Sequence, residues 1–358
     1  MSQNTGKEVF INGFHHTGTE GLFLDQSGSY MEFRGLCKEL KAEIYGASGE
    51  YPAFLAVAVK EEGDSTVKWR RSFEIQNGIH EYDLYHAETE GRRTVRILKI
   101  TEEQYGNVAV RKLMADGSER FFSAGEPIQD VQNGAWVESN PNSARDRKRN
   151  RILFLGDSMT CGYGVDGTIR DVFTTASENF MKAYPYLLAQ KLDADYDTLC
   201  SSGDGIISRY VDEGEEGPLT EDLMPALFDR ALRQGNFDHK EYSMVICNLG
   251  TNDASYIRGI PERENKFAKA YRDFLQTVYE SIHAARIVVV YGIMEKSLTE
   301  CIEKLVSELR ESGIPADFVK IENPGELNGV CFHPGEAAHK TVSEQIYEYV
   351  KEVSEESF

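Results

Sequence analysis

The fold is decided by the stretch Arg151-Ile-Leu-Phe-Leu-Gly-Asp-Ser-Met-Thr-Cys-Gly-Tyr-Gly164. Residues 152–155 form a continuous apolar run, which predicts a strand buried on both faces of a sheet. Gly156 ends that run, and Asp157 and Ser158 follow at the carboxyl end of the strand. Ligands bind at that edge in open α/β sheets, so Ser158 is a candidate nucleophile. The alternative is that Asp157 and Ser158 only cap the next helix, a role that suits both residue types.

Strands and helices are expected to alternate from this point to the end of the chain. Apolar runs predict strands at residues 152–155, 196–201, 242–248, 286–291 and 317–321. Stretches with helical periodicity predict helices at residues 180–191, 219–233, 262–283, 299–312 and 335–353. Such alternation with short connections is typical of a parallel sheet covered by helices on both faces. Residues 151–358 are therefore predicted to form a doubly wound, flavodoxin-like α/β domain.

The part of the chain that precedes this stretch has a different pattern. Short strand-like segments separated by turn residues are predicted at 9–11, 22–24, 30–33, 40–45, 54–59, 67–75, 80–85, 94–100 and 108–113. This spacing predicts an all-β, jelly-roll-like sandwich over residues 1–138. Its many aromatic residues are expected mainly in the core, with a sugar-stacking surface as the alternative. Residues 139–150 are polar, contain Pro141 and predict a linker.

Composition limits the classes of function. The 358 residues are 41% hydrophobic and 11% aromatic, which indicates a globular protein, and the length favours two domains. A formal net charge of −20 argues against nucleic acid or an anionic membrane as partner. No apolar run approaches the roughly 20 residues that span a bilayer. The amino terminus has no apolar signal core, so a cytoplasmic location is expected, with a removed signal as the alternative.

The sequence contains no pattern for a metal or a nucleotide cofactor. The six cysteines are scattered without a CxxC pair, so neither zinc nor another metal is expected, and reduced thiols are the simplest interpretation. The pair Gly162 and Gly164 lacks the third glycine of a dinucleotide fingerprint, and no phosphate-binding loop motif occurs. We therefore expect no cofactor. The oligomeric state is not predicted.

Three later segments carry residue types that a serine nucleophile needs. Gly203 follows the second predicted strand, Asn252 follows the third, and His333 precedes the last helix. Acyl transfer by serine requires a general base and donors for the developing oxyanion. His333 can be the base, and the Ser158 N–H, the Gly203 N–H and the Asn252 amide can be the donors. Each residue alone has a purely structural alternative, but all four fall at one sheet edge.

These segments also resemble a known family. The blocks Gly156-Asp-Ser158, Gly203, Gly250-Thr-Asn252-Asp and His333-Pro resemble the four blocks of the SGNH (GDSL) hydrolases. The stretch from Gly156 to Gly164 looks like that of carbohydrate esterase family 2, as do residues 91–99 in the amino-terminal half. This resemblance implies a jelly roll joined to an SGNH domain, without metal or cofactor. It also implies removal of acetyl groups from saccharides by the nucleophile Ser158 and the base His333, with Gly203 and Asn252 in the oxyanion hole.

The sequence departs from the family at the acid of the triad. Family members carry an aspartate two or three residues before the histidine, where this chain has Cys331 and Val330. Either a main-chain carbonyl orients His333, or a carboxylate comes from elsewhere, with Glu326 the nearest upstream. The same residues are compatible with a lipase, a lysophospholipase or a thioesterase. A third alternative is a carbohydrate-binding protein with an inert esterase domain. The alternative with the least support is that a thiol, of Cys161 or Cys331, is the nucleophile in place of the serine.

Overall fold

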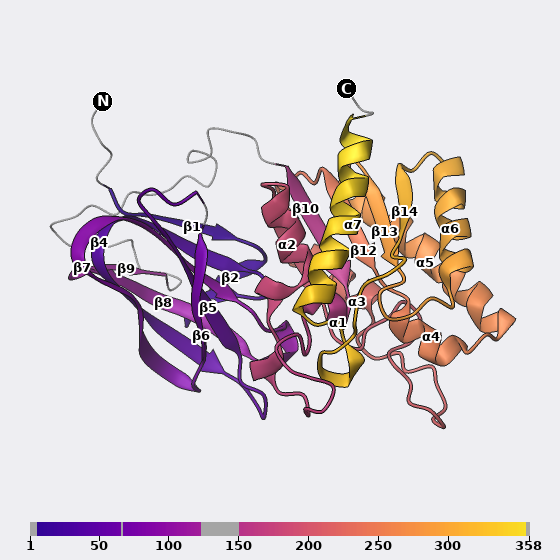
Figure 1. Ribbon diagram of the computed structural model, residues 1–358, viewed down its shortest axis with the longest axis horizontal. Helices are drawn as coiled ribbons and strands as arrows, with labels where there is room; N and C mark the ends of the chain where they lie inside the picture. Colours follow the sequence, from indigo (N-terminus) through magenta and orange to yellow (C-terminus); the bar gives the residue numbers. More distant parts are fainter. Residues whose placement is uncertain (1–5, 66, 123–149, 356–358) are drawn as a thin grey trace. The chain divides into compact units, whose positions relative to one another are not determined.

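The structure is a computed structural model that describes residues 6–65, 67–122 and 150–355 (Figure 1). The chain divides into two compact units, Met1–Lys148 and Arg149–Phe358, and each is described by itself. The predicted linker lies outside the described residues except for Asn150. Among the described helices, none is both long enough and apolar enough to pass through a bilayer.

The amino-terminal unit is an antiparallel β unit. Its strands are β1 (Glu8–Asn12), β2 (His15–Gly18), β3 (Gly21–Leu24), β4 (Tyr30–Ala47), β5 (Phe54–Glu61), β6 (Lys68–Glu74), β7 (Gly78–Lys99), β8 (Asn107–Ala115) and β9 (Ser118–Phe121). They form one sheet in the order β2-β3-β8-β4-β7-β5-β6, with β1 added to β4 and β9 to β8. The predicted all-β class is confirmed, whereas the jelly-roll arrangement stays a prediction.

Two long strands replace four predicted short ones. The segments 30–33 and 40–45 belong to the single strand β4, and the segments 80–85 and 94–100 belong to β7. The two strands pair along most of their length, with register shifts near Cys37. The prediction was wrong because the polar middle of β7 is mostly exposed and shows no apolar alternation.

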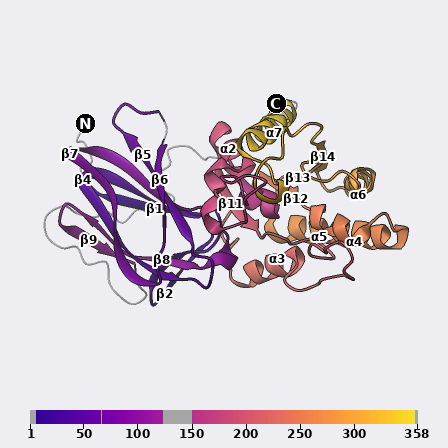
Figure 2. The same cartoon turned by 60° about the horizontal axis from the view of Figure 1, so that its bottom comes forward.

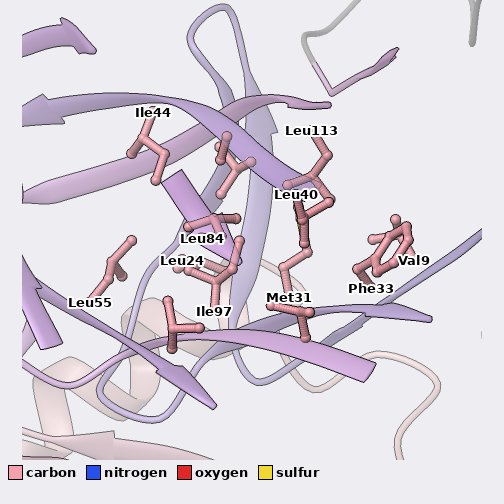
Figure 3. Packing of buried hydrophobic residues seen from close by; sticks show 14 of the residues in the cluster. Val9, Leu24, Met31, Phe33, Leu40, Ile44, Leu55, Leu84, Ile97 and Leu113 are labelled. Carbon is pink, nitrogen blue, oxygen red and sulfur yellow. The ribbon is translucent and has the colours of Figure 1, made fainter. Parts of the chain in front are cut away.

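The curl of the sheet encloses a hydrophobic core. The first part of β4 pairs with β1 and its last part pairs with β8, so different parts of this one strand have different neighbours along the same edge. Figure 3 shows side chains from β1, β3, β4, β5, β7 and β8 gathered on the inner side. Leu40, Ile44 and Leu55 have no exposed surface there, and Phe33 has almost none. This burial confirms that apolar alternation marks the inner face of the sheet.

The carboxyl-terminal unit has the predicted parallel sheet. Its strands are β10 (Arg151–Gly156), β11 (Asp195–Cys200), β12 (Met244–Asn248), β13 (Ile287–Tyr291) and β14 (Ala316–Lys320). They are parallel and lie in the order β11-β10-β12-β13-β14. This is the flavodoxin-like order, in which the first strand of the unit lies between the second and the third.

Helices cover both faces of this sheet. They are α1 (Ser158–Cys161), α2 (Tyr184–Lys191), α3 (Met224–Arg233), α4 (Thr251–Ile257), α5 (Pro261–Ile282), α6 (Thr299–Glu311) and α7 (Glu336–Glu355). Figure 2 shows α2 and α7 on one face and α3 and α5 on the other. The helix α6 packs against β14 and α5. The doubly wound fold is confirmed.

Two helices begin later than predicted, and proline explains both starts. In α3, Pro225 lies in the first turn, and Leu223, two residues before it, is extended at the N-cap position. In α2, Pro185 lies in the first turn, and residues 180–182 form a separate 3₁₀ turn. Proline suits a first turn because it has no N–H to donate, and its ring would clash with the carbonyl four residues earlier if the helix extended further toward the amino terminus.

Candidate active site

The candidate catalytic residues follow the carboxyl ends of the parallel strands. Ser158 begins α1 directly after β10, and Asn252 lies in α4 directly after β12. Gly203 follows β11, and His333 precedes α7. The strand order reverses between β10 and β12, and ligands bind at such a switch point in open α/β sheets. The fold therefore positions these residues where the sequence analysis expects them.

Ser158 and His333 form a hydrogen-bonded pair across 175 positions of sequence. The distance from Ser158 Oγ to His333 Nε2 is 2.9 Å. The serine is 7% exposed and the imidazole is half-buried, so the hydroxyl can be reached while water access is limited. A nucleophile and a base within hydrogen-bond reach are the first requirement for nucleophilic catalysis. The pair meets it.

A main-chain carbonyl orients His333. The distance from His333 Nδ1 to the Val330 carbonyl oxygen is 3.0 Å. A carbonyl only accepts hydrogen bonds, so Nδ1 carries the proton and the lone pair of Nε2 faces the serine hydroxyl. No carboxylate of the described residues forms an ion pair with this ring, and Glu326 is exposed. Of the two alternatives for the missing acid, the carbonyl is the one observed.

The segment before His333 has a strained backbone that loop contacts hold. Cys331 and Phe332 have φ values of 52° and 60°, in the left-handed region that costs non-glycine residues roughly 1–2 kcal/mol each. The Val330 N–H donates to Gly164 O (3.1 Å), and the Gly329 N–H donates to His333 O (2.9 Å). A Cβ on Gly164 would lie 2.7 Å from Val330 Cβ, so only glycine fits there. The loop after the nucleophile thus supports the base.

Burial lowers the pKa of His333 below its usual range, although hydrogen bonds with the Val330 and Cys331 backbone oppose the shift. A general base must be neutral, and a lowered pKa keeps it neutral to a lower pH. We expect kcat/KM to stay level below the ordinary histidine pKa of about 6.5 and then to fall as protons add to the ring. The pH profile with a soluble ester checks this. An acid limb centred above 6.5 would contradict it.

Asp157 caps the helix that carries the nucleophile. Its side chain accepts a hydrogen bond from Met159 N at 3.1 Å, so the capping interpretation is correct for Asp157 and holds beside the role of Ser158. Burial raises the pKa of Asp157 to about 8, the hydrogen bond from Met159 opposes the shift, and the charge of Asp253 adds to it. Near neutral pH the protonated carboxyl adds no full negative charge beside Ser158.

The loop after β11 contains Gly203, one of the candidate oxyanion donors. Gly203 has a φ of +84°, and Arg209 Nη2 lies 3.1 Å from where a Cβ would be. Within the described residues, the N–H groups of Ser158 and Gly203 donate to no protein acceptor. Asn252 Nδ2 donates to Asp204 O at 2.7 Å and lies 3.4 Å from Asp157 Oδ2. The second N–H thus makes only a long hydrogen bond, to Asp157 Oδ2, which a substrate oxygen would have to replace.

Two residues that the sequence analysis missed fix this loop. Asp253 accepts from the backbone N–H groups of Ile206, Ile207 and Ser208 at 2.7 to 3.2 Å. Arg209 donates to Ser202 O at 3.0 Å and forms an ion pair with Asp204 at 2.5 Å. Asp253 directly follows Asn252 in the same motif, and this position could have indicated a role in the site. Nothing in the sequence indicates a role for Arg209.

The cysteines do not take part in the pair. All six are free, Cys161 is fully buried and Cys331 is exposed. The serine hydroxyl is the group hydrogen-bonded to His333. The geometry therefore favours the serine over either thiol.

A serine with an imidazole base, at the switch point of a flavodoxin-like sheet, defines a serine hydrolase with an α/β fold. The family described as GDSL-like Lipase/Acylhydrolase matches residues 152–356. The chain belongs to this family. The resemblance to the SGNH (GDSL) hydrolases is confirmed.

Known proteins narrow the relationship. The cellulase/esterase CelE of Acetivibrio thermocellus is 30% identical over 210 residues, 56% of this chain and 25% of that protein. An acetylxylan esterase / glucomannan deacetylase of Cellvibrio japonicus is 27% identical, covering 59% of this chain and 52% of that protein. The structure of a family two carbohydrate esterase from Clostridium thermocellum, in complex with cellohexaose, has a TM-score of 0.75 at 23% identity and covers 96% of this chain and 98% of that one.

These comparisons differ in what they cover. The matched region spans about half or less of the length of the curated relatives. The structural match extends over both units and shows a common fold.

Proposed function

We propose that the protein is a serine esterase that removes O-acetyl groups from acetylated saccharides. The observation that carries the proposal is the hydrogen bond from Ser158 Oγ to His333 Nε2, with Nδ1 held by a carbonyl. The names of the relatives, a cellulase/esterase and an acetylxylan esterase / glucomannan deacetylase, support the acetyl group and the saccharide.

The proposed reaction has two steps. Ser158 Oγ attacks the acetyl carbonyl carbon while its proton moves to His333 Nε2, and the carbonyl oxygen becomes an oxyanion beside the Ser158 N–H, the Gly203 N–H and the Asn252 amide. The C–O bond to the sugar breaks, and the imidazolium returns the proton to the leaving sugar oxygen. A water molecule then gives a proton to His333 Nε2 and attacks the acetyl carbon of the acyl-serine. The bond from that carbon to Ser158 Oγ breaks, acetate leaves, and the imidazolium returns the proton to Ser158 Oγ. The enzyme is restored without a cofactor.

We also propose a cytoplasmic location for the enzyme. A cytoplasmic enzyme meets imported oligosaccharides, so we propose acetylated mono- and oligosaccharides as its substrates. Strong activity on insoluble polymer with weak activity on short oligomers would contradict this.

Two assays test the acyl group and the sugar. We expect p-nitrophenyl acetate to be cleaved faster than the butyrate, because each methylene that a pocket does not fit costs about 10- to 200-fold in kcat/KM. Acetate release from acetylated xylo-oligosaccharides is expected alongside. Faster cleavage of octanoyl or longer esters would favour the lipase or thioesterase alternative. Saccharide binding without any ester cleavage would favour the inert carbohydrate-binding protein.

A further inference from the structure

Tyr163 lies against the imidazole that acts as the base. The ring centroids of Tyr163 and His333 are 4.6 Å apart, and the ring planes are inclined by 42°. Aromatic rings attract cations within about 6 Å of the centroid. The imidazole becomes such a cation each time it takes the serine proton. The attraction between the Tyr163 ring and His333 is therefore stronger while His333 is protonated than while it is neutral.

A second aromatic ring and the backbone on either side of Tyr163 fix the position of the Tyr163 ring. Phe173 stacks on Tyr163 with centroids 3.8 Å apart and planes 5° from parallel. The flanking residues Gly162 and Gly164 both have positive φ, 85° and 65°. Tyr163 N donates to Ser158 O at 3.0 Å, and Gly164 O accepts from Val330 N. The turn that carries Tyr163 is thus attached both to the nucleophile and to the segment that holds the base.

Among the described residues, no carboxylate is paired with His333, and hydrogen bonds with the Val330 and Cys331 backbone favour its charged form. Val330 O contributes a dipole, and the exposed Cys331 lies on the same segment. In α7, His339 interacts electrostatically with His333 and is buried. Burial lowers the pKa of His339 to about 3, so it stays neutral. Glu336 pairs with Lys340 at 2.6 Å and Lys182 at 3.4 Å and is not paired with the base.

We propose that the Tyr163 ring stabilises the imidazolium form of His333 and supplies part of the charge stabilisation that a carboxylate gives in a triad. Tyr163 is a positioning residue in this account, because it acts on the reaction through His333. The inference rests on the proposed esterase mechanism for its effect on rate. Its effect on the protonation of His333 does not depend on the substrate.

The first test changes the ring and keeps the fold. Tyr163→Phe retains the aromatic face, and we expect its kcat to lie within about twofold of wild type. Tyr163→Leu removes the face, and we expect kcat to fall about three- to thirtyfold with KM little changed. The acid limb of its pH profile should move to lower pH, because the charged form of His333 loses stabilisation. A merely structural role would lower kcat without moving that limb.

A second test separates charge from packing and does not need a natural substrate. Tyr163 is replaced by phenylalanine with one, two or three ring fluorines, which weaken the attraction to a cation at nearly constant size. The pKa of His333, followed by NMR with labelled histidine, should fall stepwise through this series. Phe173→Leu is the matched control, because its ring stacks on Tyr163 and not on the imidazole, and it should leave that pKa closer to wild type. The same pKa across the fluorinated series would overturn the proposal.

The two proposals fail in different ways. If ester cleavage is absent in the wild type but the pKa of His333 follows the fluorine series, the esterase proposal is wrong and the Tyr163 contact holds. If ester cleavage is strong but the pKa of His333 stays the same across the fluorine series, the esterase proposal holds and the Tyr163 proposal is wrong. Thermal unfolding of each variant identifies any that fail to fold, and the fluorinated series then replaces Tyr163→Leu as the deciding measurement.

Discussion

Ser158→Ala is expected to lower the kcat for acetyl ester cleavage by about 10⁴- to 10⁶-fold, as removal of a serine nucleophile does in a triad enzyme. The hydroxyl is the only group of the pair that can form the acyl-enzyme, and its 2.9 Å contact with Nε2 shows that the base is already in place. The fold should not suffer, because alanine fits the space of serine and Asp157 still caps α1. Release of acetate and cleavage of p-nitrophenyl acetate measure the loss.

His333→Ala should cost a similar amount, and the double variant little more than either single one. Groups that act as a unit are strongly non-additive, because neither accelerates the reaction without the other. The matched control is Ser243→Ala, which removes a hydroxyl that donates to Arg151 O at the opposite end of β10. It should retain wild-type activity. Retained activity in Ser158→Ala would remove that residue from the mechanism, and independent losses for Ser158 and His333 would contradict their action as a pair.

The location of the site was predictable because it follows from a periodic pattern. Apolar runs mark the parallel strands, and the loops at their carboxyl ends must share one edge of the sheet. Ser158 and His333 therefore meet although 175 positions separate them. The same reasoning placed Gly203 and Asn252 at that edge. Their roles in the oxyanion hole stay predictions until they are tested by substitution.

The group that orients His333 could not be identified from sequence, since every residue carries a carbonyl and only the backbone path decides which one reaches the ring. The left-handed conformations of Cys331 and Phe332 direct the Val330 carbonyl to Nδ1, and neither residue type favours that conformation. Arg209 and Tyr163 were missed for a related reason. Their contacts depend on how loops close, and loops lack the periodicity that marks strands and helices.

The long strands of the amino-terminal unit show where apolar alternation fails to predict a strand. In the middle of β7, both faces carry polar side chains, so the stretch resembles a loop in sequence. The ladder with β4 holds on either side of residues 87–90, which bulge opposite Lys38 without a register partner in β4. It includes the polar residues 91–94, because backbone pairing does not depend on side-chain polarity. Apolar alternation therefore predicted the buried ends of this strand and not its continuity.

The second large effect is expected at Asn252. If the N–H that makes the long bond to Asp157 Oδ2 donates to the oxyanion instead, Asn252→Ala should lower kcat about 10²- to 10³-fold and change KM little, because the new bond forms fully only in the transition state. The same residue also donates to Asp204 O at 2.7 Å, so loosening of the loop after β11 is the competing explanation. Arg209→Lys separates the two. Lysine keeps the charge beside Asp204 but cannot reproduce the two-point contact with Ser202 O and Asp204, so this variant loosens the same loop and keeps the amide.

We expect Arg209→Lys to lose less than about tenfold in kcat, well short of the loss at Asn252, since a loosened loop misplaces one donor without removing it. The affinity of a boronic acid inhibitor, which forms a tetrahedral adduct on the serine, should decrease in Asn252→Ala in parallel with kcat/KM, because the adduct has the geometry of the transition state. Equal losses in the two variants would make Asn252 an anchor of the loop and leave the oxyanion to the Ser158 and Gly203 backbone N–H groups. An undiminished inhibitor affinity in Asn252→Ala would lead to the same conclusion.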